Sequence, residues 1–328
     1  MRRRRFITLL GATAFTWPLG ARAQKAPMPV VGFLHSGTED TYKAEADSFR
    51  AGLKEIEYIE GKNVAVEYRW ANNNVDRLPA LAADLVRRVA VILAAGPPAA
   101  LAAKAATSTV PIVAAIGSDP VQLGLARSLN RPGGNVTGAT AFTTDLVSKR
   151  VGLLCEVTPQ EATVAYLNAG PKHSLPAAPQ MTSDFVTAVR ALQRRAVIVE
   201  VDDERDFETT FQSLVGQGAG ALVIASSVFF DTHGKTLAAL TLRHSLPAIF
   251  QRLDFVQAGG MMSYSAAWND VYRTGGNYVG RILAGANPSE LAFQQSNKFE
   301  LAINLKTAKA LRLTIPPTLL ASADELIE

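Results

Sequence analysis

The stretch Val30-Val31-Gly32-Phe33-Leu34-His35-Ser36-Gly37-Thr38 indicates the fold class. Its unbroken apolar run is typical of a strand buried on both faces, as in a parallel sheet. The small and polar residues His35–Thr38 that follow predict a turn at the carboxyl end of this strand. Helical spacing over residues 42–56 and a second β-branched run over 64–70 come next. This order predicts a βαβ unit.

The same alternation continues along the chain and then begins again. Pro111 and Pro247 stand at equivalent entries to equivalent strands, before Ile112-Val113 and Ala248-Ile249. We therefore predict an α/β protein with two Rossmann-like lobes, each built on a parallel sheet. The other strands expected lie at 89–95, 111–116, 163–167, 196–201, 221–225 and 247–250, and the helices between them at 78–88, 98–107, 183–194, 206–217 and 235–244.

The last third of the chain supplies elements beyond those two series. Residues 261–264 and 299–304 are strand-like, and residues 268–283 and 306–311 have helical spacing. These elements could add to either lobe, and the pattern alone does not assign them.

Residues 1–23 have the pattern of an export signal. Four arginines precede a short apolar stretch that ends at Leu19, and Ala21-Arg22-Ala23 resembles a cleavage site. The order Arg3-Arg4-x-Phe6-Ile7 is that of a twin-arginine signal, and the general secretion route is the alternative. We expect a periplasmic, secreted protein that begins near Gln24.

Charge and cysteine content exclude several function classes. The chain has 33 Lys+Arg and 29 Asp+Glu, but five of the arginines lie in residues 1–23, which leaves 28 bases against 29 acids. Without a basic excess, no nucleic-acid partner is expected. The single cysteine, Cys155, excludes an intrachain disulfide and a thiolate metal cluster. We expect no cofactor and no metal site.

The loops after the strands are the expected ligand site, because open parallel sheets bind ligands outside the carboxyl ends of their strands. Small hydroxyl, amide and glycine residues stand there, and their N–H and O–H groups suit a carboxylate. Ser36, Asp119, Ser226 and Ser227 could instead cap helices or close turns. The candidate ligand-binding residues from these loops are Ser36, Thr38, Gly96, Gly117, Ser118, Asp119, Asn168, Ser226 and Ser227.

Aromatic residues could form a stacking wall beside a flat ligand, although each could instead belong to the core. Phe229-Phe230 directly follow Ser226-Ser227 and are the leading pair, whereas Trp268 lies in a helical pattern and is expected in the core. The candidates are Tyr42, Trp70, Phe142, Phe229, Phe230 and Tyr264, and a residue of this kind is more often part of the core than of a stacking wall.

The sequence lacks the common enzyme signatures, and we predict that the protein is not an enzyme. There is no G-x-S-x-G elbow, H-E-x-x-H motif, P-loop or dinucleotide fingerprint after the first strand. The four histidines have no zinc-ligand spacing. His35 beside Ser36 leaves a hydrolytic pair as an alternative.

Several longer stretches resemble a known family. They include Val31–Leu34, the run DRLPALA at 76–82, SLNRPGGNVTG at 128–138 and FELAINLKTAKAL at 299–311. Together they are similar to substrate-binding proteins of ABC importers in the tryptophan/tyrosine group, over essentially the whole chain after residue 23. The resemblance implies a type I periplasmic binding protein, with two lobes joined by a three-crossover hinge.

The resemblance also implies lobe boundaries and partners. One lobe would comprise residues 29–142 and 265–292, and the other 143–264 and 293–328. Thr143 and Tyr264, at the crossovers, join the candidate ligand-binding residues. The ligand would be a small carboxylate-bearing solute, an amino acid or aromatic acid, and the closed monomer would bind a permease in the inner membrane. The family's Asn-Pro-rich turn is Asn168–His173 here, and only Asn168 matches it.

Two other functions fit the same pattern. One is a ligand sensor that presents the same fold to a membrane receptor. The other is a secreted α/β hydrolase that uses Ser36 and His35.

Overall fold

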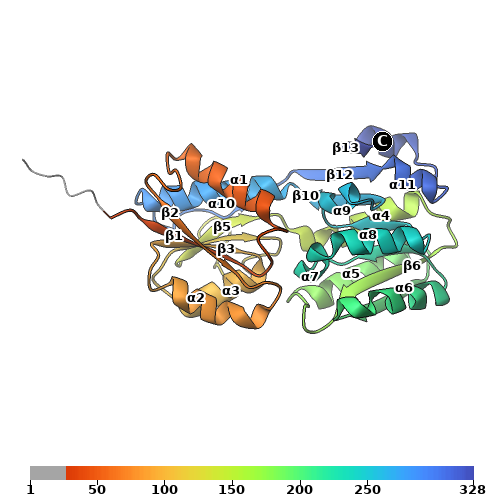
Figure 1. The fold of residues 1–328 in the computed structure, drawn as a ribbon, viewed down its shortest axis with the longest axis horizontal. Helices are drawn as coiled ribbons and strands as arrows, with labels where there is room; N and C mark the ends of the chain where they lie inside the picture. Colours follow the sequence, from red (N-terminus) through yellow and green to blue (C-terminus); the bar gives the residue numbers. More distant parts are fainter. Residues whose placement is uncertain (1–26) are drawn as a thin grey trace, which may run out of the picture.

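The computed structural model describes residues 27–328, so the predicted signal over residues 1–23 lies outside the described residues. These residues form two α/β lobes that lie side by side along the long axis of the molecule (Figure 1). One lobe holds a six-stranded sheet of order β11-β5-β4-β3-β1-β2, and the other a seven-stranded sheet of order β13-β12-β10-β9-β8-β6-β7. Within residues 27–328 no helix is long and apolar enough to cross a membrane.

The first sheet is entirely parallel and is covered by helices on both faces. Successive side chains of a strand point to opposite faces. Accordingly, Val31 and Phe33 pack in the core under α1 and α10, whereas Leu34 packs in the core under α2 and α3. The elements are β1 (Val30–His35), β2 (Ala65–Trp70), β3 (Val91–Ala95), β4 (Ile112–Ile116), β5 (Val136–Thr140), β11 (Gln294–Gln295), α1 (Lys43–Glu55), α2 (Leu78–Leu85), α3 (Pro97–Ala106) and α10 (Trp268–Leu283).

The second sheet is parallel except between β10 and β12, and one continuous apolar core spans its lobe. Its strands are β6 (Thr163–Ala169), β7 (Ala196–Val201), β8 (Ala219–Ile224), β9 (Ala248–Phe250), β10 (Met262–Ala266), β12 (Phe299–Asn304) and β13 (Glu325–Ile327). Its helices are α4 (Val147–Glu156), α5 (Ala178–Ala191), α6 (Phe207–Gly216), α7 (Val228–Thr232), α8 (Gly234–Arg243), α9 (Leu253–Gln257), α11 (Leu305–Ala310) and α12 (Pro317–Ser322). The predicted fold class, two lobes with mostly parallel sheets, is confirmed.

The chain passes between the two sheets three times, after β5, after β10 and after β11. These passages place the elements that the sequence left unassigned. The blue helix α10 returns to the first lobe and packs against the orange-red α1, while β10 and β12 extend the second sheet (Figure 1).

Two of the predicted crossovers are displaced. Strand β10 continues to Ala266, so the second passage follows Ala266 and not Tyr264-Ser265. Gln294 and Gln295 pair with Ala139 and Thr140 of β5, so residues 293–295 belong with the first sheet and not the second. The physical reason is that β5 would otherwise end the sheet with unpaired backbone groups, which this short strand satisfies.

Glycines allow α1 and α10 to approach closely. A Cβ atom at Gly52 would overlap the carbonyl of Arg273, and one at Gly276 would overlap the carbonyl of Phe49.

We expect Gly52→Ala to lower the free energy of unfolding by about 1–3 kcal/mol, because overpacking outweighs the gain in helix propensity. Urea denaturation checks this. Gly152→Ala in α4 is the control, since nothing lies near that position and stability should hold or rise. An equal loss in the free energy of unfolding in Gly52→Ala and Gly152→Ala would contradict the packing explanation.

Candidate functional site

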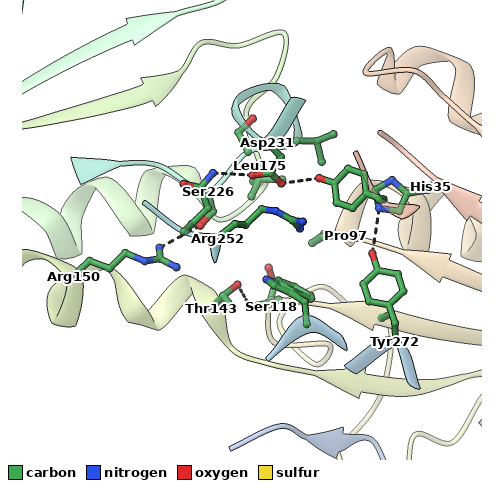
Figure 2. A pocket seen from close by; sticks show the side chains of 18 residues that line it. His35, Pro97, Ser118, Thr143, Arg150, Leu175, Ser226, Asp231, Arg252 and Tyr272 are labelled. Atoms are coloured by element: carbon green, nitrogen blue, oxygen red, sulfur yellow. Dashed lines mark hydrogen bonds between the residues drawn. The ribbon is translucent and has the colours of Figure 1, made fainter. Parts of the chain in front are cut away.

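A cavity lies between the lobes, where the strands of both sheets end, and its space of about 700 Å³ includes a part that is open to solvent. Both lobes contribute to its wall, and so do α4 and α10 (Figure 2). The residues around it are His35, Tyr42, Gly96, Pro97, Ala115, Gly117, Ser118, Thr143, Arg150, Leu175, Ser226, Ser227, Val228, Asp231, Gln251, Arg252, Trp268 and Tyr272.

The structure brings six of the candidate ligand-binding residues to this cavity. They are Gly96, Gly117, Ser118, Thr143, Ser226 and Ser227. Ser36, which is buried, instead lines a smaller adjoining cavity with Pro98 and His173. These residues meet because the carboxyl ends of neighbouring parallel strands lie at one edge of each sheet.

Four candidates do not line either cavity. The Thr38 hydroxyl bonds with Thr41 in a turn, and an Asp119 oxygen accepts from the backbone N–H of Val121. Asn168 is buried within β6. The Tyr264 ring stacks on Phe299 with ring centroids 5.9 Å apart, so only its carbonyl oxygen reaches toward the site, where it accepts from Arg150. Asp119 therefore has the turn-closing role that was its alternative, and Thr38 closes a turn as well. Ser227 lines the cavity but also caps α7, because its Oγ accepts from the Phe229 N–H at 3.2 Å.

Arg150 places a buried positive charge at the second-lobe wall. Its side chain is 1% exposed; Nε donates to the Tyr264 carbonyl (2.9 Å) and Nη1 to Ser226 Oγ (3.3 Å). Nη2 is buried without a hydrogen-bond partner, and no ion pair to Arg150 is found among the described side chains. Burial lowers the pKa of Arg150 to about 10, so it stays protonated at neutral pH. A buried charge without a counter-ion is unfavourable, so this wall favours an anion.

Asp231 and Gln251 form an acceptor site on the same lobe. Asp231 Oδ2 accepts from the Tyr42 hydroxyl at 2.6 Å, and Oδ1 accepts from Gln251 Nε2 at 2.8 Å. That bond turns Gln251 Oε1 away from Asp231, and Oε1 is buried without a donor. Burial raises the pKa of Asp231 to about 6, so most of it is ionised at pH 7. A carboxylate beside a free amide oxygen suits an ammonium group.

The first lobe supplies an aromatic wall. Tyr42, one of the predicted stacking residues, lies against the His35 ring with centroids 3.9 Å apart. Trp268 packs against the core of the first lobe, as expected, and it also lines the cavity, which was not expected. Phe229 and Phe230, the leading candidates, are buried in the core of the second lobe because they face inward from α7.

Among the described residues, two hydrogen bonds and an ion pair join the lobes across the cleft. Besides the Tyr42–Asp231 hydrogen bond, Asn73 Nδ2 donates to Thr232 Oγ1 at 3.1 Å. Arg252 of the second lobe pairs with Glu45 of the first at 2.7 Å, and both side chains are largely buried. These contacts hold the two lobes together in a closed arrangement.

The hydrolytic pair is not assembled. His35 Nδ1 accepts from the Gly37 N–H at 2.7 Å, and Nε2 lies 3.1 Å from the Tyr272 hydroxyl. Neither ring nitrogen is therefore bonded to Ser36 Oγ, which has no partner in the described part of the chain. Residues 27–328 also contain no cluster of three His, Cys, Asp or Glu side chains that could hold a metal ion.

The two lobes, the three passages between them and the cavity at the strand ends define a periplasmic binding protein of type I. The chain belongs to the family of ABC transporter substrate-binding proteins, whose model matches residues 33–327. Proteins of this family bind small-molecule ligands and ABC permeases, and they are typically extracytoplasmic and non-enzymatic.

Individual relatives are distant in sequence but cover most of the chain. A tyrosine-binding protein of Clostridioides difficile (strain R20291) is 22% identical over 266 residues, which are 80% of this chain and 75% of the relative. The structure of an ABC domain from Streptococcus pneumonia in complex with L-Trp is 20% identical, covers 91% of this chain and 99% of its own, and superposes with a TM-score of 0.82. A conserved domain protein from Vibrio cholerae gives the same coverages and TM-score at 23% identity.

Proposed function

We propose that this protein is the solute-binding component of an ABC importer that captures a free amino acid between its lobes and delivers it to an inner-membrane permease. The observation that carries the proposal is Arg150, a buried guanidinium at the cavity wall whose Nη2 has no hydrogen-bond partner among the described residues. A ligand carboxylate would supply the missing counter-ion and acceptor.

The positions of the remaining charged and polar groups support a zwitterionic ligand. Arg252 is paired with Glu45 and Asp254, whereas Asp231 accepts hydrogen bonds from the neutral groups of Tyr42 and Gln251. Arg252 offsets part of the Asp231 charge without forming an ion pair with it, and an α-ammonium group near Asp231 would add a direct partner, as the carboxylate does for Arg150. Both charged groups of the ligand would thus be held by the second lobe.

The first lobe offers a different surface, which suits the side chain of the ligand. Tyr42, Trp268 and Tyr272 present rings, and Pro97 and Ala115 present apolar groups. Flat or apolar side chains gain most from such a wall, through burial and ring stacking. One relative is named a tyrosine-binding protein and another was solved in complex with L-Trp. These names support an aromatic amino acid as the ligand.

Closure links binding to transport. Because the ligand would contact both lobes, it favours the closed arrangement by its differential affinity for that state. The permease would then recognise the closed form. Export through the signal at residues 1–23 would bring the protein to the periplasm, where this role is exercised.

A thermal-shift screen of the protein without residues 1–23 tests the proposal. The ligands are the twenty L-amino acids, the D-enantiomers of the aromatic ones, and aromatic acids without an amino group. A ligand at about 100 times its dissociation constant adds roughly 2.7 kcal/mol of stability, which raises the melting temperature by several degrees. We expect such shifts with one class of L-amino acids. No shift with any amino acid would overturn the proposal.

A further inference from the structure

The Tyr272 hydroxyl has one hydrogen bond whose direction is fixed by its neighbours. The backbone N–H of Gly37 donates to His35 Nδ1 at 2.7 Å, so Nδ1 carries no proton. The proton of the neutral ring is then on Nε2, which donates to Tyr272 Oη at 3.1 Å. Tyr272 is therefore an acceptor toward His35, and its own hydrogen must point elsewhere.

Burial keeps the His35 ring and the Tyr272 phenol in their neutral forms. Burial lowers the pKa of His35 to about 3, so the ring stays neutral and has a single N–H. Burial also raises the pKa of Tyr272 well above its usual value, so the phenol keeps its proton. Across the described residues no acceptor for that proton is found, whereas the Tyr42 hydroxyl donates to Asp231. Of these two cavity tyrosines, Tyr272 alone has a donor to offer a ligand.

The Tyr272 hydroxyl lies where the side chain of an amino acid bound at Arg150 would end. Arg150 lies on one side of the cavity, and the His35–Tyr272 pair lies on the opposite side, beyond Arg252 (Figure 2). Arg150 comes from α4 of the second lobe and Tyr272 from α10, which packs on the first. A carboxylate bound at Arg150 leaves the side chain of the ligand to extend toward Tyr272.

We propose that Tyr272, positioned by His35, selects ligands whose side chain ends in a hydrogen-bond acceptor. The inference rests on the proposed function, because it assumes an amino acid anchored at Arg150. A phenolic oxygen or a nitro group can accept from Tyr272. A phenyl ring has no such atom, and an indole N–H is a donor only, so either would leave the buried hydroxyl without its partner.

Matched ligands and one conservative variant test the proposal by isothermal titration calorimetry. The ligands are L-tyrosine against L-phenylalanine, and L-4-nitrophenylalanine against L-4-methylphenylalanine, which lacks an acceptor. We expect the wild-type protein to bind the acceptor-bearing member of each pair about tenfold more tightly. In Tyr272→Phe the ratio of affinities within each pair should fall to between about one and two. Only the acceptor-bearing ligands should lose affinity.

Two further variants separate selection from general damage. Tyr278→Phe, on the same helix, removes a hydroxyl that donates to the Ala292 carbonyl outside the cavity, and should leave both ratios unchanged. His35→Asn should reduce the ratios because the Tyr272 hydroxyl is no longer oriented. A variant that is merely less stable would not change the ratio of affinities within a pair. A lower ratio in His35→Asn therefore shows that His35 orients the Tyr272 hydroxyl.

The possible failures are distinguishable. If amino acids bind but the wild-type protein does not discriminate within the pairs, the role of Tyr272 is wrong and the proposed function stands. Ratios that persist in folded Tyr272→Phe contradict the inference in the same way. If no amino acid binds to the wild-type protein, the proposed function falls and this inference falls with it.

Discussion

Replacing Arg150 by methionine should lower the affinity for an amino-acid ligand by about 100-fold or more. The variant removes a buried cationic group whose Nη2 has no partner among the described residues at the cavity wall, and it leaves the ligand carboxylate buried without that partner. Loss of one member of a buried, hydrogen-bonded charge pair costs about 2–5 kcal/mol, and each 1.4 kcal/mol is tenfold in affinity. Calorimetric titration with the best ligand of the thermal-shift screen measures the change.

The stability of the unliganded protein should respond in a different way. Methionine approximates the length of the arginine side chain and removes a desolvated charge, so the melting temperature should stay within a few degrees of the wild type or rise. Arg194→Met is the matched control. Arg194 is also buried, but its guanidinium donates to the carbonyls of Cys155 and Thr158 and to the Thr158 hydroxyl.

Arg194→Met should therefore lose stability and keep its affinity for the ligand, the reverse of Arg150→Met. If Arg150→Met retained wild-type affinity, the carboxylate would be held elsewhere. If both arginine variants lost stability and affinity together, Arg150 would be a structural residue like Arg194.

Asp231→Asn should lower the affinity by about 10- to 100-fold and remove its pH dependence. Ionised Asp231 attracts the ligand ammonium, and the amide does not carry that charge. Burial raises the pKa of Asp231 to about 6. Below that pH the free protein is increasingly protonated at Asp231, and a proton must be released before the ammonium can bind. The affinity of the wild-type protein should therefore fall as the pH decreases from 7 to 5.

The pH profile separates this effect from a general loss of fold. In Asp231→Asn the affinity should be low and nearly constant between pH 5 and 7. Asp184→Asn is the control, because Asp184 is half-buried on α5, accepts a hydrogen bond from Gln180 and does not line the cavity. It should keep the wild-type profile. A wild-type affinity that does not change between pH 7 and 5, or a variant that keeps the wild-type slope, would contradict a role for this carboxylate.

Much of the fold could be predicted because its central strands are unbroken apolar runs. β1, β3 and β4 are buried on both faces, and apolar runs of this length, bounded by turn residues, are typical of strands in a parallel sheet. β5 was not predicted as a strand, because its sequence Val136–Thr140 alternates small and polar residues and owes its conformation to β4 beside it. β11 is two glutamines, and tertiary pairing alone defines it.

The candidate site was predicted in part, for a comparable reason. Residues at strand ends, such as Gly117, Ser118 and Ser226, could be found because the topology brings such loops together. Arg150 and Asp231 lie on helices, where charged residues usually face water. A signal for Arg150 existed: it shares the helical face of Val147, Val151 and Leu154, all of which are buried. Tyr272 likewise lies four residues after Trp268 on α10, so the two side chains share one face of the helix.

Calorimetric titration with three ligands that differ only in their charged groups tests the central claim most directly. The set is L-tyrosine, tyramine, which lacks the carboxylate, and 3-(4-hydroxyphenyl)propionate, which lacks the ammonium; if the screen selects another amino acid, its amine and acid analogues replace these. Arg150 and Asp231 together predict that the zwitterion binds at least about 100-fold more tightly than either analogue. An amine or acid analogue that binds as tightly as the amino acid would contradict the account.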